Sequence, residues 1–386
     1  MSYKEEALRF HKDNKGKVAT GLRAPIADKE TLGLAYTPGV AEPCKAIHQD
    51  PTKAYDYTWK SRTIAVISDG TAVLGLGDIG PMAALPVMEG KCNLLKSFGD
   101  VDAVPIVLDE KDPEKLIEII KALAPTYGGI NLEDISAPRC VEIERRLIEE
   151  LDIPVFHDDQ HGTAIVVVAG LINALKLVNK KFEDLRVVVC GVGAAGSSVI
   201  RMLHQVGVRE IYGFNRNGIL NKSGYEHADF LEKELIELTN PNNENYSLAE
   251  AMAKSDVFIG LSAPNLVSKE MVASMNEDAI VFALANPDPE ITYQEAKAGG
   301  ARVVGTGRSD APNQVNNVLV FPGLFKGALQ ARASKITEAM KLAAAQGLAS
   351  LISEEELHED YVIPEVFNLK VADVVAAAVV DEVERS

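Results

Sequence analysis

The chain has 386 residues, of which 47% are hydrophobic and 25% charged, and its formal net charge is −17 at pH 7. This composition is that of a soluble globular protein, and the length is enough for two domains that each bury a core. So acidic a chain is a poor partner for nucleic acid or an anionic membrane, although a small anionic substrate responds to local charge. We therefore expect neither nucleic acid nor a membrane as a partner.

The cysteines and the N-terminal residues favour the cytoplasm. The four cysteines are far apart in the sequence and form no CxxC pair, which suits free thiols in a reducing compartment. The first residues lack the apolar region of a signal peptide, and we expect no apolar run long enough to span a bilayer.

Strands alternate with helices in the first half of the chain. The expected strands cover residues 64–70, 104–108, 127–132 and 153–156, and the expected helices cover residues 113–123 and 140–151. This alternation is typical of a mostly parallel sheet that is covered on both faces. Ligands of such sheets bind beyond the carboxyl ends of the strands.

Two acidic pairs come directly after strands of this predicted sheet. Glu133 and Asp134 follow one strand, and Asp158 and Asp159 follow the next. Burying ions is costly unless they are paired or bind a metal. Four carboxylates from two strand ends suit a hard divalent cation such as Mg²⁺ or Mn²⁺.

The second pair also has simpler interpretations. In the first, Asp158 is a helix cap and has no further role, because a carboxylate in the first turn favours the positive end of the helix dipole. His157 and His161 have the spacing of a helical zinc site, but neither an HExxH pattern nor paired cysteines accompany them.

The second half of the chain contains a glycine-rich stretch between an expected strand, residues 185–190, and an expected helix, residues 197–205. The stretch reads Gly191, Val192, Gly193, Ala194, Ala195, Gly196. A GxGxxG pattern in this context predicts a dinucleotide-binding loop, whose glycines allow a tight turn and bring pyrophosphate to the helix N-terminus. The alternative interpretation is a Rossmann-like fold that binds no dinucleotide.

The expected second strand of this half, residues 210–214, ends at Asn215 and Arg216. An acid at this end often binds the ribose 2′-hydroxyl of NAD. Here Arg216 could pair with a 2′-phosphate, and Asn215 could still bind a ribose hydroxyl, so NAD and NADP both stay open.

The expected fold class is therefore α/β with two domains and a helical C-terminus. Further strands over residues 257–262, 279–286 and 302–307 complete a doubly wound sheet, and helices over residues 326–347 and 371–383 pack back on the first domain. We expect a substrate and metal domain at residues 1–160, a Rossmann domain at residues 161–325 and a helical segment at residues 326–386.

Together these motifs resemble the short bacterial form of the malic enzymes, over nearly the whole chain. The motifs that carry the resemblance stand in the same order along the chain and cover residues 36–40, 74–78, 89–91, 133–134, 158–159, 162–164, 191–196, 285–287, 316–317 and 321–323. The resemblance implies an enzyme that oxidises L-malate with NAD or NADP and then decarboxylates oxaloacetate to pyruvate. It also implies a homodimer.

The resemblance further assigns roles to residues near the acidic pairs. It implies that Glu133, Asp134 and Asp159 bind Mg²⁺ or Mn²⁺. Lys91 would take the hydroxyl proton of malate, oriented by Asp158. Such a lysine needs a pKa lowered by burial or by a nearby cation.

Other implied roles lie elsewhere in the chain. Tyr36 would protonate the enol of pyruvate, and Asn286 and Asn316 would hold the substrate carboxylates, Asn286 also bordering the cofactor. Larger family members carry a substrate-binding arginine where this chain has Ala72, and the sequence names no substitute.

Three other functions use similar parts. A malolactic-type enzyme would retain NAD and release lactate. A non-catalytic nicotinamide-binding sensor would have lost a metal ligand, Lys91 or Tyr36, yet all are present. An amino-acid dehydrogenase would not need the acidic residues as a cation site.

Overall fold

A four-stranded parallel sheet with the order β2-β1-β3-β4 organises the first half of the chain. The computed structural model describes residues 2–73 and 75–385, so Leu74 of the motif at residues 74–78 lies outside the described residues. The strands are β1 (Thr63–Ser68), β2 (Asp102–Val107), β3 (Gly129–Leu132) and β4 (Val155–His157). The apolar run over residues 64–67 fills the middle of β1, and the strand is buried along its whole length.

Helices connect these strands. They are α5 (Pro81–Gly99), α6 (Pro113–Leu123) and α7 (Arg139–Glu150). The helix α6 begins where the sequence predicts, since the Asp112 side chain accepts a hydrogen bond from the Lys115 amide and Pro113 occupies the first turn. Parallel strands end at one edge of a sheet, so the residues after β3 and β4 lie side by side.

A six-stranded sheet with the order β10-β9-β8-β5-β6-β7 forms the second half, and its pairs are parallel except β6 with β7. The strands are β5 (Arg186–Cys190), β6 (Glu210–Asn215), β7 (Gly218–Ile219), β8 (Val257–Gly260), β9 (Ile280–Ala283) and β10 (Val303–Thr306). The helices are α9 (Ala194–Gln205), α10 (Phe230–Leu238), α11 (Leu248–Met252), α12 (Lys269–Ala273) and α13 (Tyr293–Ala298). This strand order confirms the expected two-domain α/β class with a doubly wound sheet.

The helix α8 (Asp158–Val178) joins the two halves and starts directly after β4, so the second acidic pair lies in its first turn. Contrary to expectation, its 21 residues are long and apolar enough to cross a membrane, but 72% of the apolar window is buried inside the fold. The helices α9 and α15 (Glu338–Ser350) pack against it. Its apolar character is therefore that of a core helix.

The C-terminal helices are α14 (Phe321–Gln330), α15 and α16 (Val371–Arg385). The expected single helix over residues 326–347 is wrong. The chain turns at Arg332, whose φ is +49°, and α15 restarts where the Thr337 side chain accepts from the Met340 amide. Both α14 and α16 contact α5 of the first half.

One apolar core runs through both halves. It joins buried residues of the first sheet, α8, the C-terminal helices and one face of the second sheet, while the other face of the second sheet has a separate core. The two halves of the chain are therefore packed against each other through a shared core.

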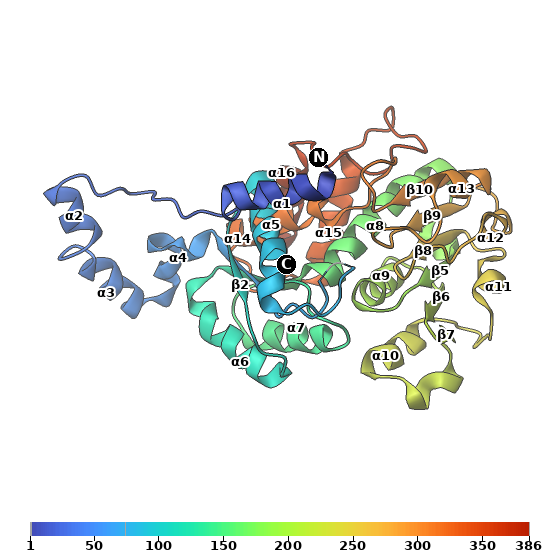
Figure 1. The fold of residues 1–386 in the computed structure, drawn as a ribbon, viewed down its shortest axis with the longest axis horizontal. Coiled ribbons are helices and arrows are strands. Elements are labelled where there is room, and N and C mark those ends of the chain that lie inside the picture. The colour runs from blue at the N-terminus through green and yellow to red at the C-terminus, as the bar shows by residue number, and fades with distance from the viewer. Residues whose placement is uncertain (1, 74, 386) are drawn as a thin grey trace.

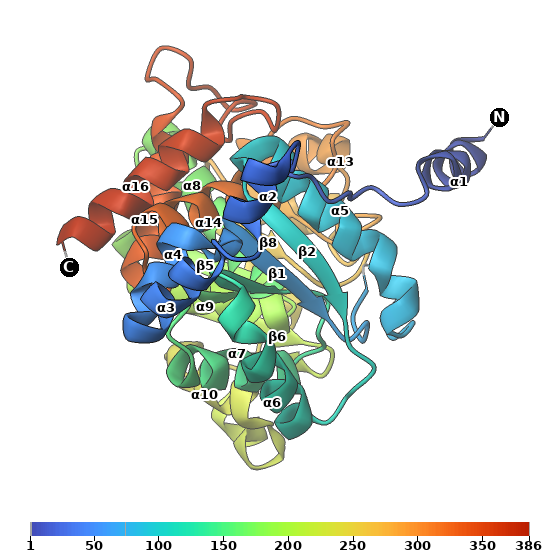
Figure 2. The same cartoon turned by 90° about the vertical axis from the view of Figure 1, so that its left-hand side faces the viewer.

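In the N-terminal arm, residues 18–50, the segment over residues 29–49 stands away from both sheets. Figure 1 shows α2 (Lys29–Ala35) and α3 (Ala41–Gln49) at the left, beyond the body of the protein, and Figure 2 views the arm from its tip. These two helices, α1 (Tyr3–Asn14) and α4 (Ala54–Tyr57) contain no buried residue. Leu34 is 71% and Tyr36 66% exposed, so the arm presents apolar side chains to solvent.

Candidate active site

A cavity of about 1340 Å³ lies between the carboxyl edge of the first sheet, α5 and the loops of the second sheet. Its lining includes residues from each set that the sequence predicts, for metal, substrate and dinucleotide: Lys91, Glu133, Asp134, Asp159, Ala194, Ala195, Asn286 and Asn316. Chain segments more than 200 residues apart in sequence thus contribute to one cavity.

Three carboxylates form an acidic cluster at one side of the cavity. Glu133, Asp134 and Asp159 each offer an oxygen, and these oxygens lie within 4.8 Å of one another. The Asp134 amide donates to the Asp159 carboxylate at 2.8 Å, which fixes the two segments together. Burial, together with the negative charge of Asp159, raises the pKa of Glu133 well above its usual value. Three oxygen donors in such a setting fit a divalent cation of the Mg²⁺ or Mn²⁺ type.

Lys91 is the buried cation beside this cluster. Its Nζ lies 2.7 Å from a Glu133 oxygen and 2.7 Å from an Asp158 oxygen, and it sits 4.3 Å from the centre of the Phe321 ring. Burial alone would lower the pKa of Lys91, but the charges of Asp158 and Glu133 outweigh it and the pKa is raised. Lys91 is therefore an ammonium in this arrangement, and it can act as a base only if one of these carboxylates is neutralised or engaged elsewhere.

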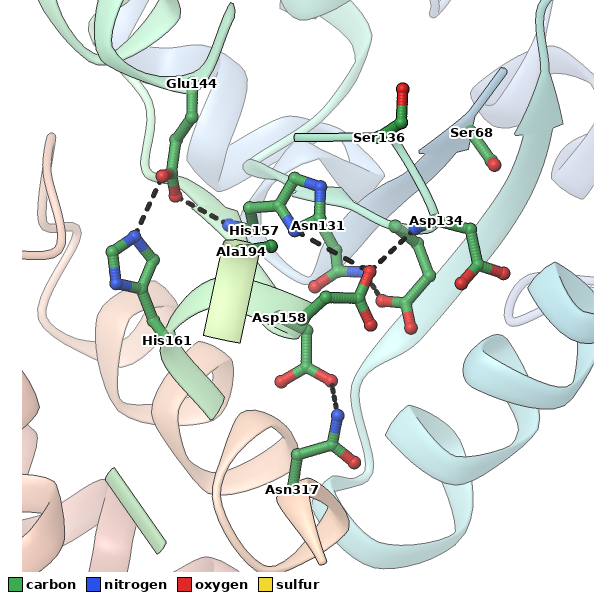
Figure 3. A network of polar contacts seen from close by, with 12 residues as sticks. Ser68, Asn131, Asp134, Ser136, Glu144, His157, Asp158, His161, Ala194 and Asn317 are labelled. Carbon is green, nitrogen blue, oxygen red and sulfur yellow. Dashed lines mark hydrogen bonds and ion pairs between the residues drawn. The ribbon is translucent and has the colours of Figure 1, made fainter. Parts of the chain in front are cut away.

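Asn317 is a residue of this site that the sequence analysis did not assign. Its amide donates to an oxygen of Asp158 (Figure 3). The same oxygen also accepts from Lys91. A Cβ at Gly162, four residues further along the same helix, would collide with the other Asp158 oxygen, so this orientation of the carboxylate requires glycine at that position. The neighbouring Asn316, the predicted residue, lines the cavity and caps the turn at Val318. The tandem asparagines were the only signal in the sequence for this position.

The two histidines of the zinc alternative take part in a different network. His161 Nε2 lies 2.8 Å from Glu144, and the same carboxylate accepts a hydrogen bond of 2.7 Å from the His157 amide (Figure 3). The Lys341 ammonium lies 3.1 Å from the other nitrogen of His161. Burial lowers the pKa of His161, which suits a neutral ring that donates to Glu144 and accepts from Lys341.

This network holds the start of α8, which carries Asp158 and Asp159, between α7 and α15. Nothing in the sequence pointed to it, because its members are separated by 17 and 180 residues. Among the described residues, the acidic cluster is the group of His, Cys, Asp and Glu side chains with metal-binding geometry, and neither histidine belongs to it.

Tyr36, the predicted acid, is not brought to this cavity by its own chain. It lies at the end of α2 on the exposed arm and is absent from the cavity lining, whereas Lys91 lies in that lining. Figure 1 shows the arm directed away from the sheets. Ala72 lines the cavity. Lys17, which has a cationic side chain, lines it as well.

The glycine loop has the form that a dinucleotide needs. Gly191 has a φ of +100°, and a Cβ at Gly191 or Gly196 would collide with backbone carbonyls. Apart from its chain neighbours, no described residue comes within 4 Å of a Cβ built on Gly193, so this face of the loop is open for pyrophosphate at the N-terminus of α9. The loop therefore fits a nicotinamide dinucleotide.

The end of β6 lies beside this loop, as the Gly191 amide donates to the Phe214 carbonyl at 2.8 Å. Asn215 is the last residue of β6, and Arg216 is exposed in the turn to β7. Asn286 borders the cavity from the far end of β9.

Comparisons with known proteins agree with this geometry. Residues 15–148 match the family model of the malic enzyme N-terminal domain, and residues 160–384 match that of the malic enzyme NAD-binding domain. The chain is 54% identical over 379 residues to a bifunctional malic/malolactic enzyme of Bacillus subtilis, covering 98% of this chain and 92% of that one.

Two further proteins are similar over most of their length. An NAD-dependent malic enzyme of Geobacillus stearothermophilus is 57% identical over 372 residues, covering 96% of this chain and 77% of the relative. The crystal structure of a malic enzyme from Pyrococcus horikoshii is 49% identical, with a TM-score of 0.96, covering 100% of this chain and 91% of that one.

Proposed function

The chain belongs to the malic enzyme family, and we propose that it oxidises L-malate with NAD or NADP and releases pyruvate and CO₂. The observation that carries this proposal is the meeting of Lys91, the acidic cluster and the dinucleotide loop at one cavity. A malate-oxidising decarboxylase needs a base, a stabiliser of developing negative charge and a hydride acceptor, and these three parts can supply them.

In the first step Lys91 would accept the proton of the malate C2 hydroxyl. A nicotinamide dinucleotide held by the glycine loop would supply the acceptor for the C2 hydride. Asp158 holds Lys91 in position through one carboxylate oxygen, and Asn317 donates to that same oxygen and so orients the carboxylate. A divalent cation held by Glu133, Asp134 and Asp159 would supply charge that stabilises the alkoxide and later the enolate. The charge of such a cation would oppose the carboxylate charges that raise the pKa of Lys91, and would bring that pKa closer to the range of a base.

The oxaloacetate formed then loses CO₂, and the resulting enol takes a proton at C3 to give pyruvate. We assign this proton to the Tyr36 hydroxyl, following the malic enzyme pattern at residues 36–40. Since Tyr36 stands on the arm, outside the cavity of its own chain, we propose that it reaches the cavity of a second copy. A symmetric dimer exchanges such arms reciprocally, and the exposed Leu34 beside Tyr36 would be buried there.

This arrangement makes the homodimer the smallest active unit. Deletion of residues 18–50 is therefore expected to give a monomer without activity, whereas a wild-type sample remains dimeric at the concentrations of the assay. Light scattering coupled to size exclusion measures both. An active monomer of the wild-type chain would contradict the proposal.

Release of lactate is the second candidate, favoured by the name of the Bacillus subtilis relative, a bifunctional malic/malolactic enzyme. That reaction would require pyruvate and the cofactor to stay bound, so that the hydride taken from malate ends on pyruvate as lactate. The free thiols of the described cysteines suit the reducing cytoplasm in which we place both reactions.

A product assay distinguishes the two reactions. The protein is incubated with L-malate, Mn²⁺ and either NAD⁺ or NADP⁺, and reduced cofactor, pyruvate and lactate are measured together. Equal amounts of reduced cofactor and pyruvate are expected. Lactate without net cofactor reduction would select the second candidate, and no consumption of malate would reject both.

A further inference from the structure

A carboxylate lies at the end of the second strand of the dinucleotide-binding sheet, where NAD and NADP differ, and its role there rests on the proposed function. In doubly wound sheets the adenosine ribose lies at the end of the second strand, next to the glycine loop. In this chain that strand is β6, and the bond from the Gly191 amide to the Phe214 carbonyl places its end against the loop. The residue at the end is Asn215, so the strand itself supplies no acid there.

A carboxylate nevertheless reaches this position from another element. The Asn215 side-chain amide donates to Glu232 Oε1 at 2.7 Å. Glu232 lies in the first turn of α10, 17 residues after Asn215, and its amide is held at 2.8 Å by the capping side chain of Asp229.

The orientation of the Asn215 amide is fixed from both sides. Its oxygen accepts a 2.7 Å hydrogen bond from the Asn217 amide while its nitrogen donates to Glu232. Rotating the amide by half a turn would place its oxygen against the Glu232 carboxylate and lose both bonds. Asn215 therefore holds the carboxylate at the ribose end of the strand.

The charge of Glu232 is not cancelled by a neighbour. Among the described residues, no lysine or arginine forms an ion pair with it, whereas Glu234 on the same helix pairs with Arg145 and Arg201. Arg216, next to Asn215 in the sequence, is exposed and forms no ion pair among the described residues. A carboxylate without a cation partner repels a 2′-phosphate and can accept a hydrogen bond from a 2′-hydroxyl.

We propose that Glu232, held by Asn215, is the specificity-determining residue of the cofactor site and selects NAD over NADP. Glu232 replaces the acidic residue that often ends this strand in NAD-binding sheets, a position where this chain has Asn215. Arg216 is exposed in the turn after β6 and takes no part in the contact between Asn215 and Glu232.

Binding measurements without malate test this proposal, since they do not depend on turnover. Dissociation constants for NAD⁺ and NADP⁺ are measured by calorimetry on the full chain and on Glu232→Gln. The parent is expected to bind NAD⁺ at least about tenfold more tightly, the scale of one charge–charge contact near a protein surface. In Glu232→Gln, NADP⁺ binding is expected to tighten by about tenfold while NAD⁺ binding changes by less than about threefold.

Glu237→Gln is the matched control, because it removes the same charge from an exposed position of α10. It should leave the ratio of the two constants unchanged. If Glu232→Gln does not fold, the two dissociation constants are measured on Glu232→Ala, which removes the charge without adding an amide. An unchanged ratio in the folded variant, or a parent that binds NADP⁺ as tightly as NAD⁺, would overturn the proposal. A parent that binds neither nucleotide would instead reject the proposed function.

Discussion

The Lys91 ammonium lies 2.7 Å from the Asp158 carboxylate, although the two residues are 67 positions apart and come from α5 and the first turn of α8. Both side chains are buried, so neither charge would be stable there alone. Their pairing is the part of the site on which the proton chemistry depends.

Replacing Lys91 should therefore stop malate oxidation while leaving the fold in place. Lys91→Ala is expected to reduce kcat by roughly 10²–10⁴-fold, the usual loss for a positioned base. Lys96→Ala is the control, since Lys96 lies on the same helix but is exposed and pairs with Asp100. Rates of cofactor reduction measure both variants. Activity of Lys91→Ala close to that of Lys96→Ala would remove Lys91 from the mechanism.

The acidic cluster predicts a requirement for a divalent cation. Asp159→Asn removes one charge from the three oxygens that lie within 4.8 Å, so Mn²⁺ should bind more weakly and the rate fall by about 10²-fold or more. Titration of Mn²⁺ by calorimetry and rates with and without EDTA check this. Full activity of the variant in EDTA would rule out the cation site.

The raised pKa of Glu133 predicts how this binding depends on pH. Burial and the charge of Asp159 raise that pKa, so protons compete with the cation at a higher pH than for an ordinary glutamate. The affinity for Mn²⁺ should fall as the pH is lowered from neutrality into the acid range, beginning above the usual pKa of a glutamate, with protons released on binding. Calorimetry in buffers of different ionisation enthalpy measures the release. Equal affinity over that range with no proton release would contradict the assignment.

Gly162 should be required because of the carboxylate beside it. A Cβ there would collide with Asp158, so Gly162→Ala should displace that carboxylate from Lys91 and lower kcat by at least about tenfold. The free energy of unfolding should fall by roughly 1–3 kcal/mol, as for other overpacked sites. Gly224→Ala should change neither quantity, since no described residue other than its chain neighbours lies within 4 Å of a Cβ added there. Denaturant titration and initial rates report both effects.

Local patterns in the sequence were sufficient for most of the fold. The continuous apolar run of β1 and the capped start of α6 were readable because neighbouring residues determine them. The break between α14 and α15 was missed, since alanine-rich sequence favours helix throughout and a single left-handed residue, Arg332, ends it.

The site was predictable only where its residues stand together in sequence. The acidic pairs and the glycine loop are such groups. The contacts of Asn317 with Asp158, of Lys341 with His161 and of Glu232 with Asn215 join residues from different elements. No pattern of neighbouring residues encodes these contacts, because tertiary packing creates them. Likewise, the sequence of Tyr36 and its neighbours does not tell which copy of the chain the tyrosine serves.

The exchange of Tyr36 between two copies is tested most directly by mixing inactive variants. Lys91→Ala and Tyr36→Phe each lack one group of the site, so each homodimer should be inactive. Chains carrying different tags are co-expressed, and the mixed dimers are purified through both tags. In a mixed dimer one site combines an intact Lys91 with an intact Tyr36 of the other copy, so about half of the wild-type activity per dimer is expected. If Tyr36 served its own chain, neither site of the mixed dimer would be complete, and no activity above that of the two parents would be found.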